Sequence, residues 1–231
     1  MRLLARLLTA FSLAFAVTGA LATPDNPQPG KDYLVLDQPQ STDAGKKVEV
    51  TEFFGYFCPH CNVFEPKLEA WVKKQGDHIV FKRIPVIFND AMVPQQKLYF
   101  ALEAMGKADE MQRKVFRYMH VDRQPLNTEE QITDFVGKNG IDKKKFAEVY
   151  NSFAVQTKVN RVPQLQQAYQ LNGVPTIAIA GRYLTSPSIV AESLGGRQPE
   201  GLLQDGALKV MDMLVTKAAK DDAKPEEKKK K

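Results

Sequence analysis

The chain has 231 residues, of which 43% are hydrophobic and 26% are charged, and its formal net charge is +5. Such a composition is ordinary for a globular protein with a buried core, and the length suits one large or two small domains. The two ends carry the positive charge and leave the chain between them neutral, which argues against a nucleic-acid-binding protein.

The five net positive charges are divided between the two ends of the chain. Arg2 and Arg6 supply two of the five net charges, and the segment from Lys217 onward supplies the other three. Within that segment, residues 219–231 show no apolar periodicity and are rich in lysine. We expect them to form a disordered, solvated tail.

The first 22 residues have the pattern of a signal peptide. Arg2 and Arg6 precede an uncharged stretch from Leu7 to Val17, and Ala20-Leu21-Ala22 fits an A-x-A cleavage site. An uncleaved membrane anchor is the alternative, but the uncharged stretch is short for a spanning helix. We therefore expect cleavage after residue 22. An exported chain whose only cysteines form a C-x-x-C motif points to the periplasm of a Gram-negative bacterium, where disulfides persist.

Past the leader, short apolar runs bounded by turn residues predict strands. The expected strands lie at 33–36, 48–54, 79–84, 176–180 and 183–185. Between the second and third of these strands, apolar residues recur at helical spacing and predict a helix whose buried face includes Phe64, Leu68 and Trp71.

Helical spacing dominates the middle of the chain. It runs from about Pro94 to Leu171, and a last helix is expected over 203–215. The simplest fold class is α/β: a sheet domain over 31–90 and 172–216, interrupted by an all-helical insertion over 91–171.

Cys58-Pro59-His60-Cys61 follows the strand predicted at 48–54 and opens a helical stretch. Thiol–disulfide exchange needs a thiolate, and a cysteine in the first turn of a helix gains free N–H groups and the positive end of the helix dipole. Cys58 has that place, and Cys61 lies one turn further on the same face. We expect Cys58 to be the exposed nucleophile and Cys61 the buried resolving thiol.

Three other uses of the motif are weaker. A structural disulfide closing so short a loop would constrain the unfolded chain little. Zinc would need three or four ligands, and the chain has no other cysteine. Haem attachment needs a histidine at position 62, which is asparagine. We therefore expect no metal and no cofactor.

His60 is one of three histidines in the chain and stands between the two cysteines. A lone histidine is usually incidental. Within a C-x-x-C loop, however, its partial positive charge and its N–H donor can stabilise the Cys58 thiolate.

Gly173-Val174-Pro175-Thr176 is the second notable segment. A proline that enters a strand indicates either a strand start or a cis peptide bond, and these residues alone do not distinguish the two.

These segments together resemble the DsbA family of periplasmic thiol–disulfide oxidoreductases, in the thioredoxin superfamily. Residues 53–61, FFGYFCPHC, resemble the family's active-site segment, and Pro59-His60 is its dipeptide. Residues 172–176 resemble its cis-proline loop, and Asn151-Ser152-Phe153 resembles a stretch of its helical domain. The similarity runs in order through most of the mature chain, including the helical insertion.

The resemblance implies a thioredoxin fold, with Pro59 and His60 tuning the redox properties of the cysteines. It also implies a cis Pro175 and an extended substrate peptide that adds to the backbone of Val174 and Pro175. In the family an acidic residue lies beneath the disulfide. Glu52 falls there, and its parity with Val48 and Val50 points it to the buried side. The family often pairs that acid with lysine, whereas Arg83 is the counterpart here.

The function implied is an oxidase that donates its disulfide to reduced, newly exported proteins and is recharged by a DsbB-like quinone-linked membrane protein. Two alternatives remain, a disulfide isomerase and a peptide-binding chaperone with a structural disulfide. Periplasmic isomerases resemble this site but carry an N-terminal dimerisation domain, and only about ten residues precede the first strand here, which argues against the isomerase. We expect a monomer.

Overall fold

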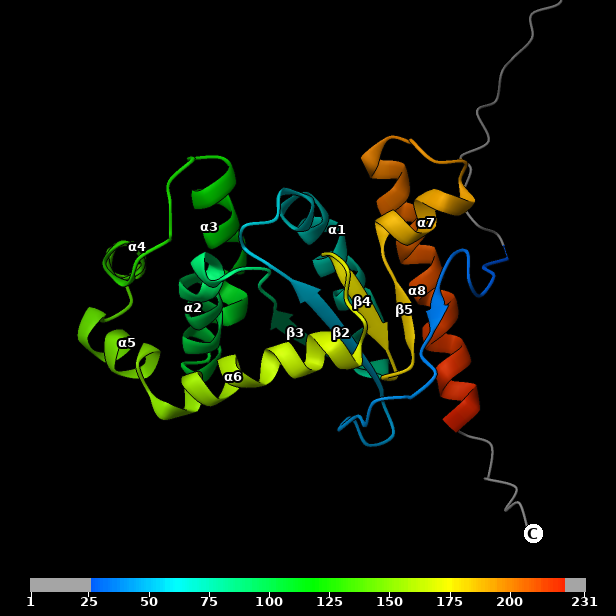
Figure 1. Ribbon diagram of the computed structural model, residues 1–231, viewed down its shortest axis with the longest axis horizontal. Helices are drawn as coiled ribbons and strands as arrows, with labels where there is room; N and C mark the ends of the chain where they lie inside the picture. Colours follow the sequence, from blue (N-terminus) through cyan, green and yellow to red (C-terminus); the bar gives the residue numbers. More distant parts are fainter. Residues whose placement is uncertain (1–25, 223–231) are drawn as a thin grey trace, which may run out of the picture.

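A computed structural model describes residues 26–222 (Figure 1). At its centre is a five-stranded sheet with the strand order β1-β5-β4-β2-β3. The strands are β1 (Leu34–Val35), β2 (Val48–Phe54), β3 (Ile79–Pro85), β4 (Thr176–Ile179) and β5 (Tyr183–Thr185). Since β2 runs parallel to β3 and antiparallel to β4, the sheet is mixed.

The described residues form eight α-helices. They are α1 (Pro59–Gln75), α2 (Val93–Ala104), α3 (Ala108–His120), α4 (Glu129–Lys138), α5 (Lys143–Tyr150), α6 (Phe153–Ala168), α7 (Pro187–Ser193) and α8 (Glu200–Asp222). Short 3-10 turns, η1 (Gly76–His78) and η2 (Asp90–Met92), precede β3 and α2. In Figure 1, α2 to α5 form a block to the left of the sheet, and α6 runs from that block back toward the strands.

Strand β2 is buried along its whole length because it lies between two other strands and between two packed layers. Val48 and Val50 join a core with residues of α1 and α8. Phe53 and Phe54 join a second core, shared with the helical block. A strand held this tightly is a rigid support for the segment that follows it, residues 55–58.

The predicted α/β class is confirmed, and all five strands lie where the apolar runs placed them. Helix α7 was missed. Its signal was present: Ser186 caps the helix by accepting a hydrogen bond from the Ile189 N–H at 3.0 Å, and Pro187 occupies the first helical position. The proposed division into two domains stays a prediction.

The last helix is longer than predicted and corrects the start of the disordered tail. Helix α8 continues to Asp222, so residues 219–222 are helical. Ala218 is buried in the core, and the Tyr183 hydroxyl donates a hydrogen bond to Asp221 at 3.0 Å, which ties the last turn to β5. The predicted signal peptide and residues 223–231 lie outside the described residues. Across 26–222, no helix is long and apolar enough to cross a membrane.

Candidate active site

The two cysteines lie where β2 gives way to α1. Cys58 is the N-cap of α1, and its sulfur accepts a hydrogen bond from the Cys61 backbone N–H at 3.3 Å. Pro59 occupies the first helical position, where its missing N–H costs no helical bond. In the turn before them, Gly55 leaves room for the Phe57 ring, which would lie 2.2 Å from a Cβ at this position. Both cysteines are free thiols in the structure.

The prediction of an exposed Cys58 is wrong in degree. Cys58 is only 5% exposed, and Cys61 is fully buried. The residues of the 173–176 loop account for this, because the Cys58 thiol donates a hydrogen bond to the Val174 carbonyl at 3.4 Å. The predicted order still holds, since Cys58 is the more accessible of the two sulfurs.

The environment pushes the pKa values of the two thiols in opposite directions. A hydrogen bond from the Cys61 thiol lowers the pKa of Cys58 most. The backbone N–H groups of Cys61 and His60 and the charge of His60 lower it further. Together these groups outweigh the effect of burial, and the pKa of Cys58 falls to about 7. Burial raises the pKa of Cys61 well above that of an ordinary thiol, and the neighbouring Cys58 raises it further. The arrangement therefore favours one thiolate, on Cys58.

The loop at 173–176 settles the alternative that its residues left open. The Val174-Pro175 peptide bond is cis, and β4 begins at the next residue, Thr176. The Thr176 hydroxyl donates a hydrogen bond to the Gly173 carbonyl at 2.8 Å. These contacts hold the Val174 carbonyl over Cys58.

His60 is exposed and has a partner that sequence reasoning missed. Its Nδ1 lies 2.8 Å from a carboxylate oxygen of Glu200, the first residue of α8, and this contact raises the pKa of His60. Among the groups that lower the pKa of Cys58, the imidazole charge contributes less than the backbone N–H groups. No local sequence pattern could have found Glu200, because 140 residues separate it from His60.

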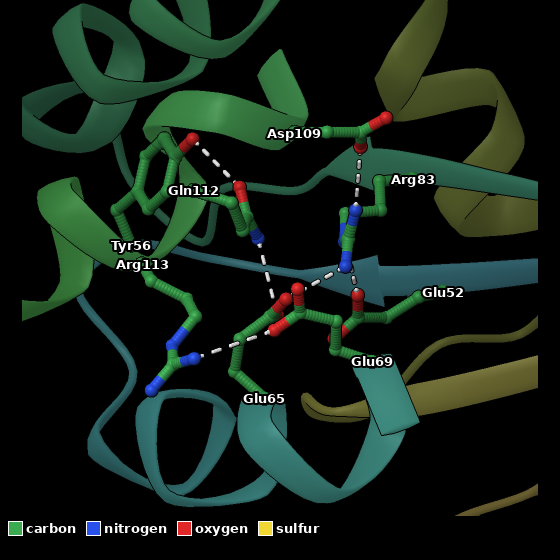
Figure 2. Close-up of polar contacts among 8 residues, drawn as sticks. All are labelled: Glu52, Tyr56, Glu65, Glu69, Arg83, Asp109, Gln112 and Arg113. Atoms are coloured by element: carbon green, nitrogen blue, oxygen red, sulfur yellow. Dashed lines mark hydrogen bonds and ion pairs between the residues drawn. The ribbon is translucent and has the colours of Figure 1, made fainter. Parts of the chain in front are cut away.

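Beneath the thiols lies a buried charged cluster around Arg83, shown in Figure 2. Glu52 and Arg83 are directly paired in the β2–β3 register, and the Arg83 Nε lies 3.1 Å from a Glu52 oxygen. The other guanidinium nitrogens lie 2.7 Å from Glu65 and 3.2 Å from Asp109. Arg83 is thus the basic partner of Glu52, with only 8% of its side chain exposed.

Glu65 extends the cluster toward the helical block. It accepts a hydrogen bond from the Gln112 amide of α3 at 3.3 Å, and the Tyr56 hydroxyl donates to the same Gln112 at 2.8 Å (Figure 2). The sequence held a signal for Glu65, because it follows Cys61 by four residues and so shares the buried face of α1.

This cluster retains protons. Burial raises the pKa of Glu52 to about 8, and the negative charge of Glu65 adds to the rise, whereas Arg83 opposes it. Burial also raises the pKa of Glu65. One guanidinium cannot neutralise two buried carboxylates and the exposed Asp109 carboxylate, so a proton bound by the buried pair lowers the cost of burial. Within residues 26–222, no three His, Cys, Asp or Glu side chains gather in a way that could hold a metal ion.

Comparison with known families and proteins matches this arrangement. The family model described as a DSBA-like thioredoxin domain matches residues 49–203. The thiol:disulfide interchange protein DsbA of Burkholderia cepacia is 45% identical over 188 residues, which cover 81% of this chain and 88% of that protein. Its counterpart in Pseudomonas aeruginosa is 35% identical over 177 residues, which cover 77% of this chain and 84% of that protein.

Solved structures are similar over nearly their whole length. The crystal structure of Pseudomonas aeruginosa DsbA superposes with a TM-score of 0.77 at 32% identity, covering 87% of this chain and 98% of that one. The oxidoreductase NmDsbA1 of Neisseria meningitidis gives 0.71 at 26% identity, covering 85% and 96%. The expected thioredoxin fold with inserted helices is therefore confirmed.

Proposed function

The chain belongs to the DsbA family of thiol:disulfide oxidoreductases, and from that membership we propose that it donates a Cys58–Cys61 disulfide to newly exported proteins in the periplasm. The observation that carries the proposal is the contrast between the two thiols. The pKa of Cys58 falls to about 7, whereas burial raises the pKa of Cys61. Such a pair stabilises the reduced protein as a Cys58 thiolate and so favours giving the disulfide away.

The exchange has two steps. A client thiolate attacks the Cys58 sulfur, which breaks the Cys58–Cys61 bond and leaves a mixed disulfide between client and Cys58. The second client thiolate then attacks the client sulfur of that mixed disulfide, and Cys58 leaves as a thiolate. The client loses two electrons and the protein gains them. Because the leaving thiol in the second step has a low pKa, release of the oxidised client is favoured.

Glu52 supplies a proton in the first step. When Cys61 leaves, its sulfur is fully buried, and a bare thiolate there would be costly. Glu52 is also fully buried, and its raised pKa of about 8 lets it hold a proton at neutral pH. The negative charge of ionised Glu52 raises the pKa of Cys61, so the two groups interact electrostatically. We assign Glu52 the role of proton donor and acceptor for Cys61.

The client peptide lies along the loop that holds Pro175. The Val174 carbonyl already lies 3.4 Å from the Cys58 sulfur, so a peptide paired to this backbone would present its own cysteine to Cys58. Main-chain pairing is tolerant of sequence, which suits a protein that acts on many clients.

Trapping of the mixed disulfide tests the proposal. In Cys61→Ser, the Cys58 thiolate can still attack a disulfide of an oxidised client and form a mixed disulfide, but Cys61 is no longer present to release it from the side of the protein. Covalent client adducts, visible as reducible high-mass bands, should therefore accumulate. Cys58→Ser should give few, since the remaining thiol is buried and has a raised pKa. The reverse pattern would exchange the roles of the two cysteines. An absence of adducts from both variants, with client binding retained, would favour the chaperone.

We also propose how the protein is recharged and where it works. The two electrons it gains must leave, and a quinone-linked membrane protein resembling DsbB is the proposed acceptor. Phe88, 49% exposed, contacts the Phe57 ring beside Cys58 and offers an apolar surface for docking. Membranes with quinone should reoxidise the reduced protein faster than air does. Residues 1–22 would direct export and be removed, and the mature protein would act as a monomer.

A further inference from the structure

The first turn of α1 and the start of α8 are joined by one contact between charged side chains. His60 Nδ1 lies 2.8 Å from Glu200 Oε1, and the two side chains are 70% and 41% exposed. Nearby, the Lys67 amine donates to the Gly201 carbonyl at 2.9 Å and lies 2.5 Å from Asp205. The start of α8 is therefore held against α1 by two separate ion pairs.

The two pairs have similar exposure but different neighbours. An exposed ion pair contributes little to stability, so neither is needed to hold the fold. Lys67–Asp205 lies further along α1 and touches no reactive group. His60–Glu200 lies two residues from Cys58, and the His60 charge is one of the contributions that favour its thiolate.

From this geometry we propose that Glu200 is a positioning residue for thiol–disulfide exchange, which keeps the His60 imidazolium charged and in place beside Cys58. The inference rests on the proposed function and adds to it a residue of α8, outside the C-x-x-C motif. A free imidazole loses its charge near pH 6.5, so at neutral pH most of it would be neutral. A carboxylate in hydrogen-bond contact favours the charged ring and extends its range upward.

The other charged groups near this turn do not replace Glu200. From α8, Asp205 is engaged by Lys67, and on α1 Lys67 is the facing cation. The Cys58 thiol is the remaining titratable neighbour, and its negative charge also favours the protonated ring. Among the described residues, Glu200 is the one carboxylate in contact with His60.

The effect should depend on pH in a bounded window. Well below the ordinary imidazole pKa, His60 is charged with or without Glu200, and Cys58 is protonated. Well above the raised pKa of His60, the ring is neutral in both cases. Removal of Glu200 should therefore matter most near pH 7, where it would change the charge of the ring and so the stability of the thiolate.

The test is the redox equilibrium with glutathione, measured from pH 5.5 to 8.5 for the unaltered protein, Glu200→Gln and the matched control Asp205→Asn. Near pH 7, Glu200→Gln should be less oxidising by a factor below about threefold, because its effect cannot exceed that of removing the imidazole, which changes the pKa of Cys58 by about 0.5 unit. The difference should shrink at both ends of the range. Asp205→Asn, which loosens the same helix contact, should follow the unaltered protein throughout.

A second comparison shows whether Glu200 acts through the imidazole. In a His60→Ser background, Glu200→Gln should leave the glutathione equilibrium unchanged. A shift of equal size in that background, a shift independent of pH, or no shift in the single variant would each overturn the role of Glu200. These failures are distinct from failure of the proposed function, in which the unaltered protein would not exchange its thiols with glutathione at all.

Discussion

Two charged clusters flank the cysteine pair, and they differ in nearly every physical respect. Below the thiols, Arg83 is held by Glu52 and Glu65 in a buried setting, where charges interact strongly and protons are retained. Above them, His60 and Glu200 meet in water, where the same kind of contact is weak. We propose that the buried cluster governs the protonation of Cys61 and that the exposed pair adjusts the stability of the Cys58 thiolate.

The largest effect is expected from removing the buried cation. Arg83→Met removes the cation that Glu52 and Glu65 share. The buried pair, which holds one proton at neutral pH, then keeps an unpaired carboxylate or must bind a second proton, and this should lower the free energy of unfolding by about 3–5 kcal/mol. Denaturant unfolding measures this. The control is Arg113→Met, since Arg113 lies 3.8 Å from Glu69 on the surface and should change stability by less than about 1 kcal/mol (Figure 2). Equal losses in both variants would mean that burial does not set the strength of these contacts.

The next effect concerns the pH dependence of stability. The pKa of Glu52 is about 8 in the folded protein against an ordinary value of 4.5, so the folded state binds the proton more tightly than the unfolded chain. This contribution is complete below pH 4.5 and is lost as pH rises toward 8. Relative to Glu52→Gln, the unaltered protein should therefore lose several kcal/mol across that interval, with about 5 kcal/mol as the upper bound for a rise of this size. Parallel stability curves for the two proteins would contradict a raised pKa at Glu52.

The smallest effect belongs to the exposed cluster. His60→Ser should raise the pKa of Cys58 by about 0.5 unit and leave the fold intact, because the backbone N–H donors of the helix start remain. Thiolate absorbance measures the pKa. His78→Ser, on an exposed histidine beyond the other end of α1, is the control and should change nothing. A rise of two units would make the imidazole, and not the helix start, the main support of the thiolate.

The sequence predicted the parts of this site that depend on local spacing. The strand at 48–54, the helix start at Cys58 and the parity that buries Glu52 all follow from patterns a few residues long. Glu65 could have been added by the same reasoning, since it shares a helix face with Cys61.

What the sequence could not predict are the contacts between distant segments. Asp109 and Gln112 of α3 contact Arg83 and Glu65. Glu200 of α8 contacts His60. The partners in each contact are far apart in the sequence, so no local pattern specifies them. The low exposure of Cys58 has the same origin, because Val174 covers it from a loop more than a hundred residues away.

The central claim is that the first turn of α1 gives Cys58 and Cys61 very different pKa values. The most direct measurement is the absorbance of thiolate against pH in the reduced protein, repeated with Cys58→Ser. One thiolate should appear near pH 7 and vanish in Cys58→Ser, while Cys61 stays protonated well above the pH at which a free thiol ionises. A Cys58 step near pH 8.5, as for a free cysteine, or two thiols that ionise together, would contradict the account.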